Sequence, residues 1–287
     1  MDISLAKSKH KQELKKLWKH CFHDDDEFIN IWFDGFFKSE NTVICTENDN
    51  ILGALQFVCY DITDKAGKVI KSAYICGVGV YEKYRGLKIG TNLMNFAHEI
   101  LKERNIQLAF LISEADEFYY NLGYKAHCSK LSFSFTPSPV FCPSYTIKDE
   151  VKNALKIYNH YCSTFDFYIN RTASEFNYIT NHYSLYGGFK TLYFKNSPCA
   201  YIAYYIEDGC FYADEIAFSS QEGLAAILDY VYKSGCKKAV ITTSGNDGLK
   251  SLISATKIQK TRTILVLELN NSSEFMNTAE NCFISVL

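Results

Sequence analysis

The segment from Ala73 to Thr91 constrains the fold of this chain more than any other part of the sequence. Its apolar first part, which ends at Val80, predicts a β-strand, and an amphipathic helix pattern begins near Ile89. A short charged turn joins the two and runs into the sequence RGLKIG at residues 85–90. The first N–H groups of a helix lack intrahelical partners, and the helix dipole favours negative charge beside them. A basic, glycine-bearing turn between a strand and a helix therefore predicts a phosphate-binding site.

Composition argues against several classes of protein. The 287 residues are 47% hydrophobic and 22% charged, which is typical of a globular chain long enough for two domains. The formal net charge is −2 and no long basic run occurs, so we expect no nucleic-acid partner. No run approaches the ~20 apolar residues of a membrane span, so we expect no membrane partner.

The cysteines bear on the compartment of the protein. The eleven cysteines contain no CxxC pair, and the N-terminus lacks the apolar core of a signal peptide. We therefore expect a cytoplasmic protein whose thiols are reduced and mostly buried. A zinc site is the alternative interpretation, but structural zinc sites usually show paired cysteine spacing, so no metal is predicted.

Hydrophobic periodicity predicts the same order of elements twice. The first half reads as two helices, three strands, a helix, a strand, a short helix and a strand that ends at Phe135. Three prolines punctuate residues 137–144, which we interpret as a linker. The second half repeats the order up to Leu269, with its last helix at residues 246–256. We therefore predict a mixed α/β fold with a duplicated domain, at residues 1–136 and 145–287.

A second motif follows at Glu117–Tyr124, with the sequence EFYYNLGY. Together with RGLKIG and the helix–strand pair between the two motifs, it resembles the GCN5-related N-acetyltransferase (GNAT) superfamily over about residues 3–135. The tandem arrangement is similar to the branch of the mycobacterial Eis (enhanced intracellular survival) acetyltransferases. Members of that branch often carry an additional C-terminal domain, for which we expect this chain to be too short.

The resemblance implies that the first domain uses acetyl-CoA as a co-substrate. The strand backbone would bind the pantetheine arm, and the turn would wrap the pyrophosphate. The residues implied in coenzyme binding are Val78, Gly79, Val80, Arg85, Gly86, Leu87, Lys88, Ile89, Gly90 and Thr91.

Lys88 departs from the family motif, which has its middle glycine at this position. A lysine in a positive-φ conformation would cost ~1 kcal/mol or more. We favour the other interpretation, in which position 88 is already helical, no energy is lost and the ammonium meets a phosphate. Gly86 and Gly90 still allow the backbone to approach a ligand closely.

The second half has no such turn, because the equivalent residues 219–223 read SSQEG. Glu222 would repel a pyrophosphate, and no lysine or arginine in the turn compensates. We predict a degenerate domain that binds no coenzyme, covers the first domain and shapes the acceptor site.

Acetyl transfer to an amine requires two proton movements. The amine loses a proton, and the departing thiolate, whose thiol pKa is about 8.5, gains one. The resemblance implies that Tyr119 is the general acid, since a tyrosine hydroxyl can donate to the thiolate. Tyr120 is the neighbour most easily confused with it, and an aromatic core position is the alternative interpretation of Tyr119.

The general base is left open, because the strand segment Ser72–Val80 contains no carboxylate. The candidates are Glu82, Glu114, His23, His98, the acidic run Asp24–Glu27 and, by resemblance to the Eis branch, the C-terminal carboxylate of Leu287. His98 falls on the polar side of its helix, so we expect it to be solvated. The acidic run is interpreted as a solvated helix start, and the alternative is a rim that attracts cationic acceptors.

These observations predict an N-acetyltransferase in which the amine of a small molecule or peptide attacks the thioester directly in a ternary complex. A covalent route through Cys76 is disfavoured, because its strand neighbours predict a buried, inert thiol. A non-catalytic acyl-CoA-binding or regulatory module is the alternative function. The sequence leaves open the acceptor, the length of the acyl group and whether the chain forms a homo-oligomer.

Overall fold

The computed structural model describes residues 1–113, 115–243, 249, 253–270 and 282–283 of the chain. Contacts divide the chain into two compact units. Unit 1 comprises Met1–Ile62, Val69–His127 and Ile264–Thr278, and unit 2 comprises Thr63–Lys68, Cys128–Thr263 and Ala279–Leu287. Each unit therefore takes in segments from both halves of the sequence. The contiguous limits expected from the sequence, 1–136 and 145–287, describe the two repeats and stay a prediction.

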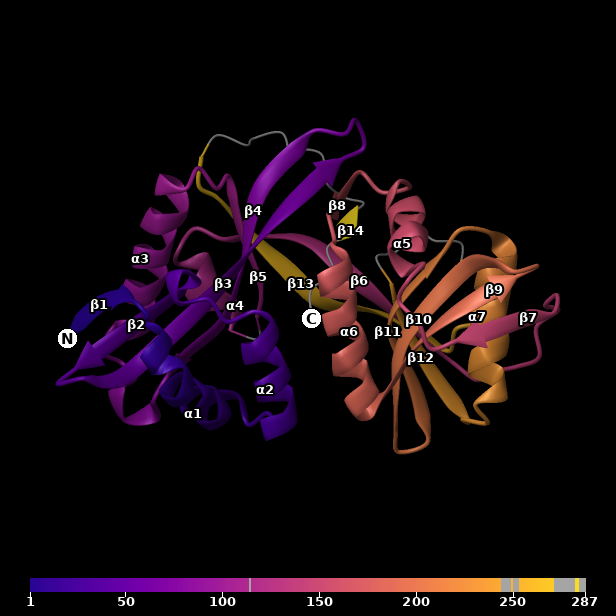
Figure 1. Cartoon of the computed structure of the whole chain (residues 1–287), viewed down its shortest axis with the longest axis horizontal. Helices are drawn as coiled ribbons and strands as arrows, with labels where there is room; N and C mark the ends of the chain where they lie inside the picture. The colour runs from indigo at the N-terminus through magenta and orange to yellow at the C-terminus, as the bar shows by residue number, and fades with distance from the viewer. Residues whose placement is uncertain (114, 244–248, 250–252, 271–281, 284–287) are drawn as a thin grey trace. The chain divides into compact units, whose positions relative to one another are not determined.

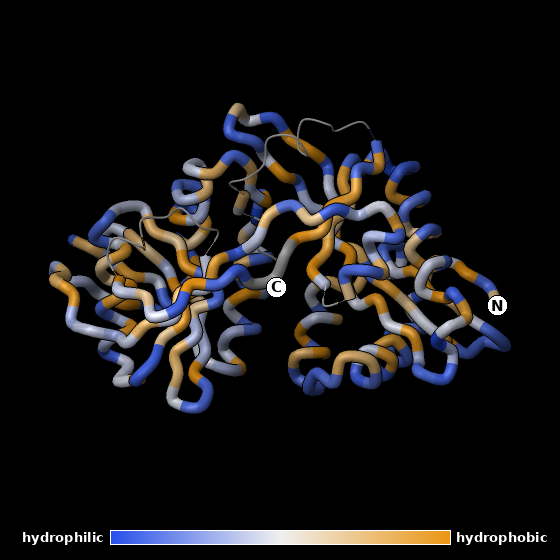
Figure 2. Tube along the Cα trace, turned by 180° about the vertical axis from the view of Figure 1, so that it is seen from behind, coloured by the Kyte–Doolittle hydropathy of each residue, from blue (hydrophilic) through white to orange (hydrophobic). Residues whose placement is uncertain are grey.

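Unit 1 contains a mixed sheet with the strand order β1-β2-β3-β4-β5-β13 (Figure 1). The pairs β1–β2, β2–β3 and β5–β13 are antiparallel, whereas β4 and β5 run parallel. Figure 2 shows that hydrophobic residues follow these strands through the middle of the unit. The strands are β1 (Asp2–Leu5), β2 (Thr42–Glu47), β3 (Asn50–Asp64), β4 (Val69–Val80), β5 (Leu108–Ile112) and β13 (Lys257–Glu268).

The helices of unit 1 cover both faces of its sheet. Gly79 faces Cys21 of α1, whereas its strand neighbours Val78 and Val80 pack against the core that α3 and α4 share. Because successive strand residues point to opposite faces, α1 lies on one face and α3 and α4 on the other. The helices and 3-10 turns are η1 (Ser8–His10), α1 (Lys11–Phe22), α2 (Asp26–Gly35), η2 (Ser39–Asn41), η3 (Glu82–Tyr84), α3 (Ile89–Glu103) and α4 (Asp116–Tyr120).

Strand β4 changes the direction of its side chains at Gly77. Ala73 and Ile75 point into the core on the α3 face before this residue, and Val78 and Val80 do so after it. Gly77 has a φ of 59°, a left-handed conformation that favours glycine. The strand therefore accommodates one extra residue at Gly77 while its apolar side chains stay on the same face of the sheet, as in a β-bulge.

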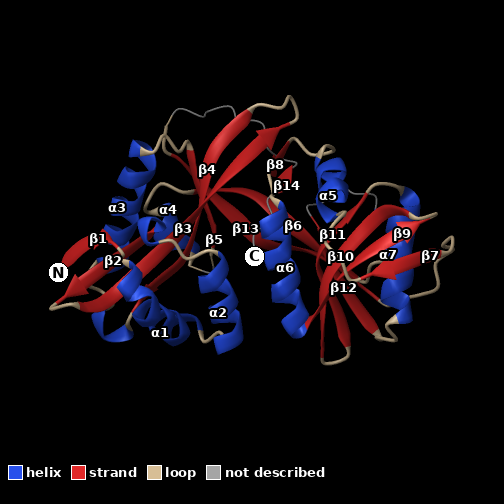
Figure 3. Cartoon of the chain, in the orientation of Figure 1, coloured by secondary structure: helices blue, strands red, loops and turns tan. Residues whose placement is uncertain are grey.

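Unit 2 contains a sheet with the order β6-β12-β11-β10-β9-β7 (Figure 3). Only β11 and β12 are parallel among the neighbours whose register is described in this unit's sheet. A short parallel pair, β8 with β14, lies outside this order. The strands are β6 (Lys125–Phe135), β7 (Tyr145–Lys148), β8 (Phe167–Ile169), β9 (Gly187–Phe194), β10 (Ser197–Glu207), β11 (Cys210–Phe218), β12 (Lys238–Thr243) and β14 (Cys282–Phe283).

The second half repeats the order of the first, as the sequence predicts. Helices α5 (Ala154–Cys162) and α6 (Ala173–Tyr186) precede three antiparallel strands, and α7 (Gln221–Lys233) and β12 follow. The register of β10 and β11 shifts so that Asp214, in the middle of β11, has no opposite residue, whereas the irregularity of β4 at Gly77 lies near the end of that strand. The expected helix at residues 246–256 lies largely outside the described residues.

Side-chain chemistry in unit 2 centres on a buried ion pair. Arg171 donates to both carboxylate oxygens of Glu215, at 2.6 and 2.8 Å, and the two side chains are only 4% and 7% exposed. The Tyr201 hydroxyl donates to Glu215 at 2.7 Å, and the guanidinium lies 4.6 Å from the ring centroid of Tyr158. Such bidentate geometry satisfies both charges, but loss of either partner leaves the other buried and unpaired.

We expect Arg171→Met to lower the free energy of unfolding by about 3–5 kcal/mol, because it leaves the Glu215 carboxylate buried without its counter-charge. The double variant with Glu215→Gln should recover most of this loss, which urea denaturation measures. Lys19→Met is the control, since it breaks an exposed ion pair with Asp26 and should cost at most about 1 kcal/mol. Equal losses of stability in Arg171→Met and Lys19→Met would contradict a special role for the buried pair.

Candidate functional site

The site in unit 1 begins where β4 and β5 part. The parallel register pairs Ser72–Tyr74 with Leu108–Phe110, after which β4 continues to Val80 and β5 to Ile112. The other edge of β5 stays paired with β13 through residues 108–112. Beyond these pairs the described residues of β4 and β5 share no register, and the Val80 carbonyl accepts from Nε of Arg85 at 3.4 Å. This parted end is where the sequence places Val78, Gly79 and Val80.

The turn after β4 leads directly into α3. Gly86 has a φ of 83° and an open environment, since no atom lies within 4 Å of the place where a Cβ would be. The first α-helical bond of α3 runs from the Asn92 N–H to the Lys88 carbonyl, so the preceding N–H groups have no helical acceptor. Lys88 makes no side-chain cap, and the first turn of α3 holds no acidic residue. The arrangement suits an anionic ligand.

Lys88 adopts the conformation that the sequence interpretation did not favour. Its φ of 59° and ψ of 16° are left-handed, so the preference for a helical residue 88 is wrong. The family motif has its glycine here because the backbone uses this conformation, which costs a residue with a Cβ about 1–2 kcal/mol. The Lys88 side chain is exposed, so its ammonium is available to a bound anion.

Phe118 joins the two sequence motifs. A Cβ added at Gly90 in the first turn of α3 would lie 3.3 Å from Cζ of Phe118, so the Phe118 ring packs against this glycine. Phe118 also meets Tyr119 edge to face, with ring centroids 4.9 Å apart. The structure therefore brings Tyr119 next to the start of α3. Of the other predicted residues of the turn, Ile89 is buried in the core and Leu87 is 52% exposed.

Tyr119 is 9% exposed, and its environment keeps it protonated. Burial, and to a smaller extent the nearby Cys76 thiol of β4, raise the pKa of Tyr119 to about 12. Burial also raises the pKa of Cys76, whose thiol donates to the Gln56 carbonyl at 3.6 Å. A protonated thiol is a poor nucleophile, whereas a protonated phenol near the parted strands is a suitable proton donor.

The α1 face of β4 carries an indole ring over Gly77. A Cβ at Gly77 would lie 2.5 Å from the Trp18 ring, so only glycine permits this approach. The Trp18 Nε1 donates to the Asp24 carboxylate at 2.8 Å. Sequence reasoning missed this contact, although the spacing of Gly77 and Gly79 in one strand was a signal that another element approaches closely.

The predicted general bases occupy different environments. Within the acidic run, Asp25 caps α2 by accepting from the Phe28 N–H at 2.7 Å, and Asp26 pairs with Lys19 at 2.8 Å. Glu82 is exposed in η3. Glu114 and Leu287 lie outside the described residues. Asp24 is the candidate in the described part of the chain whose contacts lead to β4, through Trp18.

His98 is buried rather than solvated, so the expectation from its helix position is wrong. It is 6% exposed, and its Nε2 lies 3.0 Å from the hydroxyl of Tyr124, itself 2% exposed. Burial, with a smaller contribution from Lys102, lowers the pKa of His98 to about 4. No sequence pattern reports this contact, because residue 98 lies at the border of the apolar stripe and its partner Tyr124 is 26 residues away, at the end of the second motif.

The corresponding turn of unit 2 is already occupied by the chain's own side chains. Ser220 caps α7 by accepting from the Gly223 N–H at 3.2 Å. The pKa of Glu222 is lowered by a hydrogen bond from its own backbone N–H and by one from Ser220. An acidic side chain and a cap thus take the place that an external anion would need.

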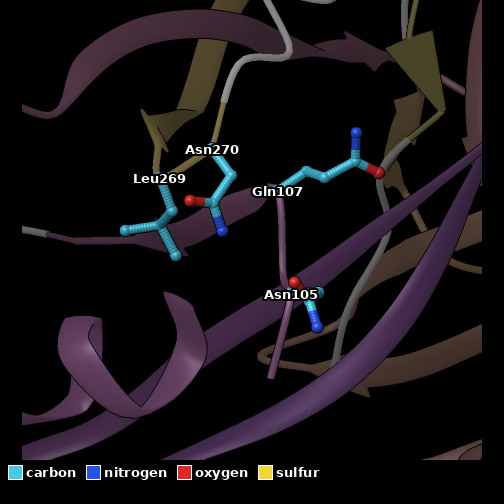
Figure 4. A pocket seen from close by; sticks show the side chains of 4 residues that line it. All are labelled: Asn105, Gln107, Leu269 and Asn270. Atoms are coloured by element: carbon cyan, nitrogen blue, oxygen red, sulfur yellow. The ribbon is translucent and has the colours of Figure 1, made fainter. Parts of the chain in front are cut away.

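A polar pocket of about 460 Å³ lies at the other end of β5 (Figure 4). Leu269 and the three carboxamide residues Asn105, Gln107 and Asn270 line it, and all precede β5 or follow β13. The pocket contains no titratable side chain among its described lining. It lies at the end of β5 opposite to the site at the parted strands.

The comparison with protein families concerns the part of the chain that holds this site. Residues 2–127 match the model of an acetyltransferase (GNAT) domain. Residues 2–127 form a GNAT acetyltransferase domain. The predicted resemblance is therefore confirmed for the segment that contains the basic turn, α3 and the motif with Tyr119. No curated protein matches the chain in sequence.

Solved structures extend the fold of the GNAT domain to nearly the whole chain. A GCN5-related N-acetyltransferase from Anabaena variabilis matches with a TM-score of 0.80 and 15% identity, over 94% of this chain and 73% of that one. A protein from Enterococcus faecalis, a probable N-acyltransferase, gives 0.79 and 15%, over 93% and 72%. Eis1 from Mycobacterium abscessus gives 0.72 and 12%, over 95% and 74%. At these identities the likeness concerns the fold, and it confirms the mixed α/β class and a fold similar to that of Eis1.

Three further observations concern membrane spans, disulfide bonds and metal-binding clusters in the described part of the chain. No helix in the described part of the chain is long and apolar enough to cross a membrane. All eleven cysteines lie among the described residues and form no disulfide bond. No cluster of three or more metal-binding side chains occurs in the residues that the structure describes.

We expect Lys88→Gly to raise the free energy of unfolding by about 0.5–1 kcal/mol, because glycine removes the left-handed strain at a small cost in chain entropy. Lys88→Ala is the matched control, since it removes the same charge but keeps a Cβ. Thermal denaturation compares the three proteins. The same gain in both variants would show that charge, not backbone conformation, limits stability at this position.

Acid should destabilise the GNAT domain through His98. The unfolded chain binds this proton near pH 6.5, whereas the folded His98 binds it only near pH 4. Protonation therefore favours unfolding, and up to about 3 kcal/mol of stability is lost between pH 6.5 and 4. Urea denaturation at pH 7.5 and 4.5 measures this loss. The double variant His98→Phe with Tyr124→Phe removes the titrating imidazole together with the hydroxyl that bonds to it, so it should lose less stability between these two pH values. An unchanged pH dependence would contradict the assignment.

Proposed function

We propose that the chain is an acetyl-CoA-dependent N-acetyltransferase that moves an acetyl group to a primary amine of a small molecule or peptide. The single observation that carries the proposal is the juxtaposition, within one GNAT domain, of an open basic helix start and a protonated buried tyrosine. Both lie beside strands that part. The first feature suits a phosphorylated coenzyme and the second suits its reacting end.

The turn supports binding of the coenzyme phosphates. Arg85 and Lys88 are exposed cations on either side of the open Gly86, and the unpaired N–H groups of α3 follow. Cationic side chains and a helix N-terminus together favour an anion. The parted edges of β4 and β5 would then pair with the amides of the pantetheine arm, through the backbone of Val78, Gly79 and Val80.

Tyr119 supports the chemical step. A phenol whose pKa is about 12 remains protonated at neutral pH and can give its proton to a thiolate as the thiolate leaves. The ternary mechanism requires no acyl-enzyme, which agrees with the protonated state of the Cys76 thiol. The amine would attack the thioester carbonyl directly and lose its proton to a base.

Asp24 is our candidate for that base, directly or through water. Its carboxylate is held by the Trp18 indole, which itself lies over Gly77 beside the parted strands. The same carboxylate would attract a cationic amine. For unit 2 we propose a supporting role in shaping the acceptor site without coenzyme, because its own Ser220 and Glu222 fill the equivalent helix start.

We expect Tyr119→Phe to lower kcat about 10²- to 10⁴-fold with little change in KM, because it removes a proton donor and not a binding group. The measurement is release of the coenzyme thiol with a panel of amines, after calorimetry has established that wild-type protein binds acetyl-CoA. Tyr120→Phe is the matched control, since Tyr120 is the exposed neighbour and should leave kcat unchanged.

The possible outcomes separate the proposal from its alternative. Binding of acetyl-CoA without turnover of any amine would favour a non-catalytic acyl-CoA-binding module. Absence of binding would overturn both functions. Turnover that survives Tyr119→Phe but not Tyr120→Phe would show that the general acid is the neighbouring tyrosine.

A further inference from the structure

We propose that His98 is a positioning residue for Tyr119 and that it acts through Tyr124. This inference rests on the proposed function, in which Tyr119 gives a proton to the leaving thiolate. His98 belongs to α3, Tyr124 follows α4 and Tyr119 is in α4, so the three side chains connect the helix that starts at the coenzyme turn with the general acid.

The contact between His98 and Tyr124 is a buried hydrogen bond in apolar surroundings. Nε2 of His98 lies 3.0 Å from the Tyr124 hydroxyl, and the ring centroids are 5.7 Å apart. The neighbouring core residues include Met94, Ala97 and Leu101 of α3. A polar pair in such a core costs free energy unless both members are satisfied, and each of these two satisfies the other.

Tyr124 in turn holds Tyr119 by its ring and by its backbone. The two rings meet edge to face, with centroids 5.9 Å apart and an interplanar angle of 77°. The Tyr124 N–H donates to the Tyr119 carbonyl at 3.1 Å. Phe118 also meets the Tyr119 ring, at 78°, and packs on Gly90. The ring of Tyr119 therefore contacts two aromatic neighbours, and His98 bonds to one of them.

The titratable groups around this cluster are compatible with an uncharged interior. His98 is influenced by Glu99 and Lys102 of its own helix, which pair with each other at 2.9 Å on the surface. From other elements, Tyr124 and Tyr119 face the cluster, and Cys76 of β4 faces Tyr119. Burial keeps all four inner groups neutral at physiological pH. An imidazolium in this place would favour the tyrosinate form, so a neutral histidine helps Tyr119 to keep its proton until the transfer.

The experiment is a double-mutant cycle between His98 and Tyr119. We expect His98→Phe to lower kcat for thiol release about 10- to 100-fold with KM values unchanged, because a small misplacement of a catalytic group has this effect. In the Tyr119→Phe background the same change should have no further effect on kcat. His98→Gln should recover most of the activity, since its amide can still bond to the Tyr124 hydroxyl. Circular dichroism establishes that each variant is folded.

The outcomes distinguish this inference from the proposed function. Equal losses of kcat in both backgrounds, or no loss with Tyr119 present, would overturn the positioning role and leave the transferase activity standing. Absence of turnover by the wild-type protein would overturn both. If His98→Phe does not fold, Tyr124→Phe takes its place in the cycle, because it breaks the same hydrogen bond. Additivity of Tyr124→Phe with Tyr119→Phe would again refute the role. His160→Phe, at an exposed histidine of α5, is the control for the exchange itself.

Discussion

The parting of β4 and β5 is the constraint on which the site in the GNAT domain depends. Only the first residues of the parallel pair share a ladder, and β13 holds the outer edge of β5 beyond that point. The facing backbone groups of β4 and β5 therefore remain at the end of the sheet without each other, although backbone N–H and C=O groups require partners. A ligand that carries amides can provide them. Gly77 contributes to this geometry, because its left-handed backbone lets β4 continue with its apolar side chains on the same face while Trp18 closes the opposite face.

The two units use the same plan with different contents, and the difference is electrostatic. Each has an irregularity in the strand that precedes a helix, in β4 before α3 and in β11 before α7. In unit 1 that place is occupied by a glycine under an indole, followed by a basic and uncapped helix start. In unit 2 it is occupied by Glu215, which Arg171 and Tyr201 satisfy, followed by a helix that Ser220 caps. Charges that are satisfied internally leave nothing for an external anion, and this difference supports the proposal that only unit 1 binds the coenzyme.

Most of the elements of the GNAT domain could be predicted from the sequence, because the signals for them are local. A strand, a glycine-bearing turn and a helix follow one another within residues 69–103, and periodicity reports each of them. What it did not report depends on contacts between distant residues. The pairing of β13 with β5 joins segments about 150 residues apart, and the environment of His98 is decided by Tyr124. The conformation of Lys88 was misread for another reason, since a single side chain does not reveal φ. The glycine of the family motif was the better guide to that backbone.

The resulting site has two ends of opposite electrostatic character. Its outer end is exposed and cationic, with Arg85, Lys88 and the open N–H groups of α3. Its inner end consists of groups that burial keeps uncharged, namely Tyr119, Tyr124, Cys76 and His98. A highly charged coenzyme can thus be held by its phosphates where solvent remains, while its reacting end lies among neutral groups in a low dielectric. A proton donor is most effective in such surroundings, because the developing thiolate has few competing partners and the phenol is still protonated when the sulfur leaves.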